Sequence, residues 1–186
     1  MRIVTYGGAV SLDGFLTGPN ESIDWIQFSR GAQEYMAAFW KNIDAILMGR
    51  KTYAFSVAHQ PSAQKTNKKK TARKPPVRPT YVFSRTLESI DDPNAQLVTT
   101  DAAEFVRGLK RKPGKNICLM GGGELAQSLL AAGLVDEIGL NIHPVLLGSG
   151  VPVFRDIGRR MKMTLTECRQ LEGGCILAQY QVQRGE

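Results

Sequence analysis

The chain has few of the residues that build metal sites, hydrolase triads and disulfide frameworks. It contains three cysteines, Cys118, Cys168 and Cys175, and two histidines, His59 and His143. The cysteines are odd in number, far apart and without a Cys-x-x-Cys pair, which predicts reduced, buried thiols in a reducing compartment. Because neither histidine lies near a cysteine or paired carboxylates in the sequence, we expect no metal site and no Ser–His–Asp hydrolase.

Long apolar segments are missing as well. No stretch approaches the roughly 18 consecutive apolar residues of a membrane helix, so we expect no membrane-spanning segment and no membrane as a partner. Residues 1–6 lack the apolar region and cleavage site of a signal peptide, which favours a cytoplasmic protein. The 186 residues and a hydrophobic fraction of 42% predict a single soluble domain over residues 1–186.

One segment lacks acidic residues altogether. Residues 65–78 contain seven Lys and Arg, and these seven equal the net surplus of the whole chain (24 − 17 = 7). The rest of the chain is therefore neutral, whereas a nucleic-acid-binding domain usually carries a broad basic face. Aromatic residues for stacking on single strands are also absent from the segment. We predict a basic loop insertion at about residues 59–79, and rank nucleic-acid binding through residues 65–78 last among the candidate functions.

A glycine-rich junction is the strongest positive signal. Residues 116–120 predict a buried strand, three glycines follow at 121–123, and a helical pattern begins at once. Glycine lets the backbone approach a ligand closely, and a helix N-terminus presents unpaired N–H groups with a partial positive charge. The junction predicts the phosphate cradle of a nucleotide cofactor. Tight strand-to-helix packing alone is the alternative explanation of the glycines.

The remaining pattern alternates strands and helices and then changes to hairpins. Strands are predicted over residues 2–10, 44–48, 80–84, 96–99, 137–147 and 151–154, and helices over residues 33–40, from 49 onward, over 101–110 and up to Gly133. Residues 163–171 and 176–183 predict a terminal antiparallel hairpin. Gly121-x-Gly123-x-x-Ala126 matches the dinucleotide motif, but Asp136 and Glu137 precede the next strand and only hairpins follow, which excludes a Rossmann topology.

Four short motifs occur in order along the chain. They are Ser11-Leu12-Asp13-Gly14-Phe15, Met48-Gly49-Arg50-Lys51-Thr52-Tyr53, Val82-Phe83-Ser84-Arg85-Thr86 and Gly121-Gly122-Gly123-Glu124-Leu125. With them the chain resembles the dihydrofolate-reductase-like superfamily, in the branch of the riboflavin-biosynthesis reductase domain (the C-terminal domain of the bifunctional deaminase–reductase) and its stand-alone relatives. The resemblance implies an α/β fold with a mixed, mainly parallel sheet flanked by helices and a C-terminal antiparallel hairpin. It also implies NADPH as hydride donor and a homodimer paired through the sheets.

The resemblance places cofactor contacts in the last three motifs. The residues expected to bind the cofactor are Gly49, Arg50, Lys51, Thr52, Ser84, Arg85, Gly121, Gly122, Gly123, Glu124 and Leu125. Arg50 suits a phosphate because arginine pairs with it bidentately, and Arg85 follows a strand end where an arginine commonly meets the 2′-phosphate of NADP. Solvated helix charges and an exposed turn are the simpler alternatives for these two arginines.

Hydride transfer also needs a proton source, which a carboxyl with a raised pKa, or a water that it orients, can supply. The resemblance makes Asp13 the first candidate, because the matching motif lies by the nicotinamide, although an Asp-Gly turn needs no chemistry. Asp24 is the second candidate, and Trp25 is expected to line the substrate pocket. Folate reductases carry a carboxylate shortly after the loop tryptophan, and residues 27–32 contain none, which counts against folate.

The resulting hypothesis is an NADPH-dependent reductase of a small heterocyclic or carbonyl substrate. A module that binds NADP(H) without turnover is the first alternative. The nucleic-acid-binding protein is the second, and the neutral remainder of the chain counts against it.

Overall fold

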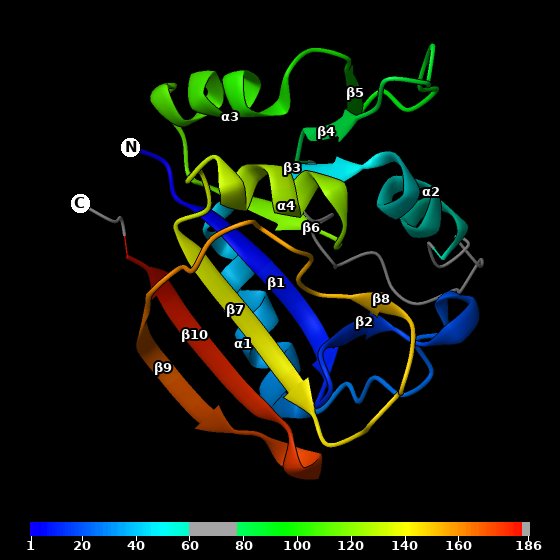
Figure 1. Ribbon diagram of the computed structural model, residues 1–186, viewed down its shortest axis with the longest axis vertical. Helices are drawn as coiled ribbons and strands as arrows, with labels where there is room; N and C mark the ends of the chain where they lie inside the picture. The colour runs from blue at the N-terminus through cyan, green and yellow to red at the C-terminus, as the bar shows by residue number, and fades with distance from the viewer. Residues whose placement is uncertain (60–77, 184–186) are drawn as a thin grey trace, which may run out of the picture.

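A mixed sheet of eight strands runs through the computed structural model, which describes residues 1–59 and 78–183 (Figure 1). The strands of the structure are β1 Val4–Ser11, β2 Phe15–Thr17, β3 Ile43–Gly49, β4 Thr80–Phe83, β5 Ala95–Val98, β6 Asn116–Met120, β7 Glu137–His143, β8 Val151–Pro152, β9 Met163–Gln170 and β10 Ile176–Val182. The large sheet has the order β5-β4-β3-β6-β1-β7-β10-β9. Its strands from β5 to β7 are parallel neighbours, whereas β10 is antiparallel to both β7 and β9. The predicted fold class and the C-terminal antiparallel hairpin are confirmed.

Helices cover both faces of the sheet. They are α1 Arg30–Lys41, α2 Arg50–Ala58, α3 Ala102–Arg111 and α4 Glu124–Ala131, with the short 3-10 turns Pro19–Glu21 and Glu172–Gly174. In Figure 1, α1 lies behind β1 and β7, whereas α4 lies in front of β6. The central strands are buried on both sides, as parallel strands usually are, and Tyr6, Leu47 and Leu119 are fully buried. Leu109 of α3 and Leu129 of α4 complete this core.

The predicted helix ends have the expected capping contacts. The Ser29 hydroxyl accepts from the Ala32 N–H at 3.2 Å before α1. The Asp101 carboxylate accepts from the Glu104 N–H at 2.9 Å before α3. Such caps satisfy backbone N–H groups that have no partner inside the helix. After α4, Gly133 adopts φ +66°, the left-handed conformation that favours glycine at a helix C-terminus.

Two elements differ from the prediction. β2 lies where a turn and loop were expected, and it pairs with β8 in a separate two-stranded sheet. β7 ends at His143 rather than at residue 147, because Pro144 has no N–H to continue the ladder and the Leu147 N–H donates to Asp13 instead. Short strands such as β2 carry too little local pattern to be recognised, since their pairing partner is more than a hundred residues away.

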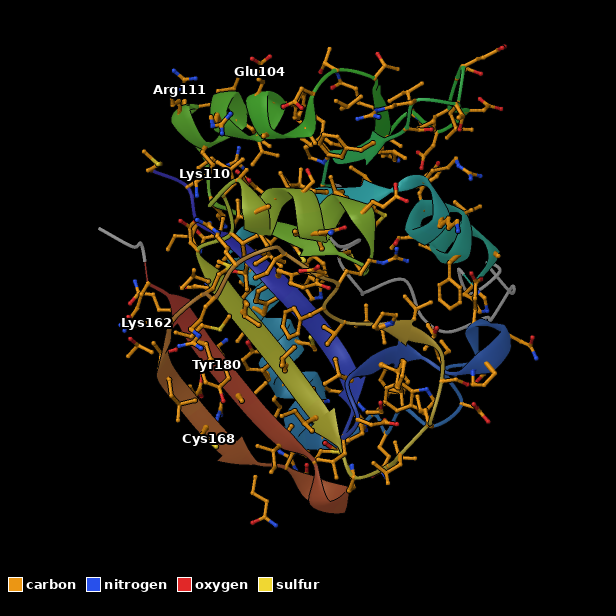
Figure 2. The ribbon with its side chains drawn as sticks, viewed as in Figure 1. Glu104, Lys110, Arg111, Lys162, Cys168 and Tyr180 are labelled. Carbon is orange, nitrogen blue, oxygen red and sulfur yellow. The ribbon has the colours of Figure 1, made fainter. Side chains whose placement is uncertain are left out.

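The cysteines are only partly as predicted. All three are free thiols, and Cys118 and Cys175 are buried. Cys168 is exposed, contrary to the expectation of buried thiols, because it lies on β9 at the edge of the sheet (Figure 2). Burial raises the pKa of the Cys118 thiol to about 12.

The predicted basic insertion lies mostly outside the described residues, which omit residues 60–77. Arg78 at its end is described, and its guanidinium donates to the Ile43 carbonyl at 2.8 Å and to the Trp40 carbonyl at 2.6 Å. It also stacks over the Trp40 ring at 5.2 Å. Arg78, one of the seven cations of residues 65–78, therefore joins α1 to β3 within the fold. In the described parts of the chain, no helix has the length and apolar character to span a membrane.

Candidate active site

The predicted motifs meet at the carboxyl ends of neighbouring parallel strands. Gly49 at the end of β3 is in register with Phe83 at the end of β4, and Met48 is in register with Met120 at the end of β6. The second, third and fourth motifs therefore leave three adjacent parallel strands at the same level. Ligands of open α/β sheets bind at the carboxyl ends of the strands, so the carboxyl ends of β3, β4 and β6 form the candidate site.

Contact between Gly121 and Thr52 brings two helix N-termini together. Gly121 has φ +81°, and a Cβ built on it would lie 2.0 Å from the Thr52 hydroxyl oxygen. Only glycine fits this close approach without strain. The start of α4 consequently lies against the first turn of α2, although more than sixty residues separate them in the sequence.

Both helices begin without a side-chain cap. Their N-cap residues are Gly49 for α2 and Gly123 for α4, and neither supplies a hydrogen bond to the first turn. Among residues 1–59 and 78–183, the leading N–H groups of both helices thus lack a capping side chain, and together with the helix dipoles they favour an anion. Arg50 and Lys51 are exposed in the first turn of α2 and add positive charge there.

The other predicted residues of the fourth motif contribute differently. The Glu124 side chain is exposed, so it adds a negative charge beside the cradle and leaves its backbone N–H as the group suited to a phosphate. Leu125 packs against the hydrophobic core, which leaves only its backbone for a ligand. A Cβ on Gly122 would lie 2.8 Å from both Leu16 Cδ1 and the Pro152 carbonyl oxygen. The β2–β8 ribbon therefore covers this part of the loop.

Arg155 is a site residue that sequence reasoning missed. Its Nε lies 3.8 Å from the Cβ position of Gly123, next to the start of α4. No local motif surrounds it, since it follows β8 and reaches the glycine loop only through the tertiary fold. The residues of the third motif lie beside α2 through the register of Phe83 with Gly49. There the Ser84 hydroxyl accepts from the backbone N–H groups of Thr86 and Leu87 at 3.2 and 3.0 Å, and so shapes the turn that carries the exposed Arg85.

Asp13 is held as a carboxylate at the carboxyl end of β1. It accepts from the Ser11 hydroxyl at 2.6 Å, from the Leu147 N–H at 3.1 Å and from the Gly148 N–H at 2.7 Å. These bonds, the Ser11 hydroxyl first, lower the pKa of Asp13 below its ordinary value of 3.8. Of the two routes to a proton, a carboxyl with a raised pKa or a water that the carboxyl orients, the lowered pKa favours the second, because the loop after β7 supplies donors that stabilise the carboxylate.

Titration of Asp13 gives a testable stability profile. Since its pKa is lowered by folding, its contribution is complete above pH 3.8 and is lost as the pH falls below that value. We expect Asp13→Asn to lower the free energy of unfolding by a constant amount between about pH 5 and 8, and the two proteins to converge in acid. Urea unfolding across the pH range measures this. A difference that shrank as the pH rose from about 4 to 8 would instead indicate a raised pKa.

Asp24 and Trp25 lie in the turn before α1. Asp24 is exposed, whereas Trp25 is half-buried and its indole N–H donates to the Ser22 carbonyl at 3.3 Å. The Trp25 ring meets the His143 ring edge to face at 5.3 Å between centroids. His143 is in register with Ser11, so the turn lies at the same end of the sheet as Asp13. Sequence reasoning missed His143 because its neighbours come from three separate segments.

Elsewhere, the described residues form a cavity but no metal-binding cluster. Among residues 1–59 and 78–183, no group of three His, Cys, Asp or Glu side chains is placed to hold a metal ion. A cavity of about 630 Å³ lies at the opposite end of α4, where Gly133, Arg159 and Lys162 contribute to its lining. None of its lining residues belongs to the predicted site.

Comparison with known proteins identifies the family and the fold. The family model described as the RibD C-terminal domain matches residues 2–177. The uncharacterised protein YyaP of Bacillus subtilis strain 168 is 36% identical over 173 residues, which are 92% of this chain and 90% of that protein. A solved structure from Shewanella sp. PV-4, named as a proposed riboflavin biosynthesis protein, has a TM-score of 0.83 at 21% identity and covers 98% of this chain and 100% of its own.

A bifunctional enzyme of Thermotoga maritima shares the fold over part of its length. It is named a diaminohydroxyphosphoribosylaminopyrimidine deaminase/5-amino-6-(5-phosphoribosylamino)uracil reductase. The superposition has a TM-score of 0.69 at 15% identity, and it covers 98% of this chain and 57% of that one. At such identities the two solved structures show the common fold.

Proposed function

Because the chain belongs to the RibD C-terminal domain family, we propose that it is an NADPH-dependent reductase that transfers a hydride to a small heterocyclic or carbonyl substrate. The observation that carries the proposal is the convergence of two helix N-termini, where Gly121 packs on Thr52. Neither helix has a side-chain cap, so the N–H groups are available to a diphosphate.

In this proposal, different residues of the chain contact different parts of NADPH. The backbone of Gly121, Gly122 and Gly123 lines the pyrophosphate side of the cleft, opposite Thr52 and Arg50. Arg85 leaves the end of β4 and is the residue proposed to meet the 2′-phosphate. NADPH supplies the hydride when it is bound, and the protein supplies position and charge.

The proton is proposed to reach the substrate through a water. The lowered pKa of Asp13 makes its carboxylate an acceptor at neutral pH rather than a donor, and an anionic acceptor orients water. Asp24 is the second proposed proton source, from the exposed turn before α1. Trp25 would line the substrate side of the same cleft, since it packs on His143 at the carboxyl end of β7.

The substrate class follows from the family and from one absence in the sequence. The Thermotoga maritima protein carries in its name the reduction of a phosphoribosylamino uracil, a small heterocycle. No acid occurs in residues 27–32 of this chain, which counts against the folate substrate of the wider superfamily. A pyrimidine, a pteridine-like ring or a simple carbonyl compound fits the proposal.

A cofactor-binding module without turnover is the alternative. It would bind NADPH with the same residues and show no oxidation of NADPH with any acceptor. Nucleic-acid binding through residues 65–78 has less support, since the charge of the chain outside this segment is balanced and Arg78 donates to backbone carbonyls of the fold.

A homodimer is part of the proposal. β9 forms one edge of the large sheet, and Leu165 on it is 51% exposed. An exposed edge strand is a template for pairing with another chain, which supports dimerisation through this edge. Light scattering of the purified protein tests it, and a monomeric mass would contradict it.

Replacing Arg85 tests the choice of cofactor. We expect Arg85→Ala to weaken NADPH binding by about 10- to 100-fold, because a charge-assisted hydrogen bond contributes about 1.5–3 kcal/mol. NADH, which lacks the 2′-phosphate, should bind both proteins equally. Fluorescence titration measures the dissociation constants.

Arg107→Ala is the matched control for Arg85→Ala, since it removes one exposed arginine from α3, away from the cleft. Equal affinity of the unaltered protein for NADH and NADPH would contradict the role of Arg85. Absence of NADPH binding would contradict the reductase proposal itself.

A further inference from the structure

A buried histidine, His143, lies at the carboxyl end of β7, beside the proposed site. His143 is 0% exposed, although its imidazole is one of the few titratable groups of the core. Its ring has four neighbours from three segments: Trp25 and Gln27 before α1, Asn141 on its own strand, and Cys175 before β10. The hydrogen-bonding and ring partners of His143 are thus residues other than Asp13 and Arg50 of the proposed site.

The contacts determine which ring nitrogen carries the proton. The backbone N–H of Gln27 points at His143 Nδ1 at 3.4 Å, and a backbone N–H can only donate. Nδ1 must therefore be an acceptor, and the proton of the neutral ring lies on Nε2. The Cys175 thiol, 3.3 Å from Nδ1, is then the second donor to the same lone pair. Burial lowers the pKa of His143, which favours this neutral form.

The neighbouring amide agrees with this assignment once its orientation is considered. The Asn141 side chain lies 3.2 Å from His143 Nε2 through Nδ2, and its buried Oδ1 has no hydrogen-bond partner among the described residues. Two donors would face each other in that arrangement. Exchanging the oxygen and nitrogen of the amide, which have nearly the same shape, lets Oδ1 accept from Nε2–H. The unpaired buried oxygen is thereby satisfied.

We propose that His143, as a neutral imidazole with its proton on Nε2, is the positioning residue that fixes the Trp25–Gln27 segment at the substrate side of the cleft. Its ring edge orients Trp25 and its Nδ1 holds the Gln27 backbone, while Asn141 and Cys175 fix the ring. The register of His143 with Ser11 places this unit on the strand next to the residue that binds Asp13. That this segment lies at the substrate side rests on the proposed reductase function. The tautomer of His143 and its hold on the Trp25–Gln27 segment, which we call the clamp, do not depend on that function.

The tautomer is tested directly by nuclear magnetic resonance. The chain has two histidines, so His59→Asn leaves His143 as the sole imidazole in nitrogen–proton correlation spectra. We expect a neutral ring protonated on Nε2 at pH 7. A ring protonated on Nδ1, or a charged ring at that pH, would overturn the proposal. The measurement needs no substrate and no cofactor.

The clamp is tested by hydrogen exchange of the Gln27 amide. We expect about fivefold faster exchange in His143→Leu, which keeps the bulk and removes the acceptor, since a hydrogen bond contributes about 1 kcal/mol. His143→Asn retains an acceptor near the Nδ1 position and should restore most of the protection. The Ala32 amide, which bonds to Ser29, is the internal control and should not change. Unchanged Gln27 exchange in His143→Leu would contradict the clamp.

Trp25 provides the third readout. Trp40→Phe leaves Trp25 as the only tryptophan, and its fluorescence should fall as acid protonates His143 below the ordinary pKa of 6.5. The ring contacts from Trp25, Gln27 and Asn141 are uncharged, and the Cys175 thiol has a raised pKa. The nearby acids are Asp24 beside Trp25 and Glu172 beside Gly173, and the His143→Leu variant separates their titration from that of His143. The transition should vanish in His143→Leu while NADPH affinity stays unchanged. Loss of NADPH binding in all variants would refute the reductase proposal and leave the clamp standing.

Discussion

Gly121→Ala is expected to weaken NADPH binding by at least about tenfold. Its φ of +81° is a left-handed conformation that costs a residue with a Cβ about 1–2 kcal/mol. The added methyl would also lie 2.0 Å from the Thr52 hydroxyl, so the starts of α2 and α4 must separate. A separation of these two helix ends removes the geometry proposed for the pyrophosphate, and 1.4 kcal/mol corresponds to tenfold in affinity.

A control separates the strain from the clash. Gly158 has φ +69° and nothing within 4 Å of its Cβ position, so Gly158→Ala adds similar strain in open space. We expect NADPH affinity to be unchanged in this variant. In the double variant of Gly121→Ala with Thr52→Ala, the loss of unfolding free energy should be smaller than the sum of the two single losses, because the clashing groups are removed. Fluorescence titration and urea unfolding measure these effects. Wild-type affinity in Gly121→Ala would contradict the proposed cradle.

Lys110→Met is expected to lower the free energy of unfolding by about 3–5 kcal/mol, the usual cost of breaking a buried ion pair from one side. Figure 2 shows Lys110 on the side of α3 that faces the sheet, whereas Glu104 and Arg111 point away. Its side chain is 5% exposed and forms an ion pair with Asp136, which is 16% exposed. Its ammonium also donates to the Leu134 carbonyl at 3.2 Å.

The lower free energy of unfolding in Lys110→Met arises because the Asp136 carboxylate loses its cationic partner. Asp136 also accepts from the Val4 N–H at 2.8 Å, so it ties the loop after α4 to the first residue of β1. Methionine keeps the apolar stem of Lys110 but cannot neutralise the Asp136 charge. Lys112→Met, at an exposed position two residues on, is the control and should change stability by less than about 0.5 kcal/mol. Equal denaturation midpoints for the two variants would show that the pair contributes little.

Local pattern determined most of the elements in advance. The apolar runs of β1, β3 and β6, the caps at Ser29 and Asp101, and the terminal hairpin were predicted because each depends on neighbours within a few residues. The strand β2 and the end of β7 were not, since pairing with β8 and donation to Asp13 depend on distant segments. Cys168 was expected inside, and its exposure follows from the position of β9 at the sheet edge.

The candidate site divides in the same way. Glycines at 49 and 121–123 and the arginines at 50 and 85 were recognised from motifs, because a phosphate cradle is built from contiguous backbone. The lowered pKa of Asp13 was not predicted, since it depends partly on N–H donors from the loop after β7. Arg155 and the His143 cluster carry no local signal, because each gathers residues from separate segments.

The sequence by itself therefore determined the α/β pattern, the family and the position of the glycine-rich turn between β6 and α4, since these depend on local propensity and short contiguous motifs. Tertiary structure alone decided that Thr52 packs on Gly121, that Asp13 is held as a carboxylate, and that a neutral His143 lies against Trp25. Those three features depend on distances and on burial between segments far apart in the chain. These features arise because the neighbouring strands are parallel, so that the carboxyl ends of β4, β3, β6, β1 and β7 lie on the same side of the sheet.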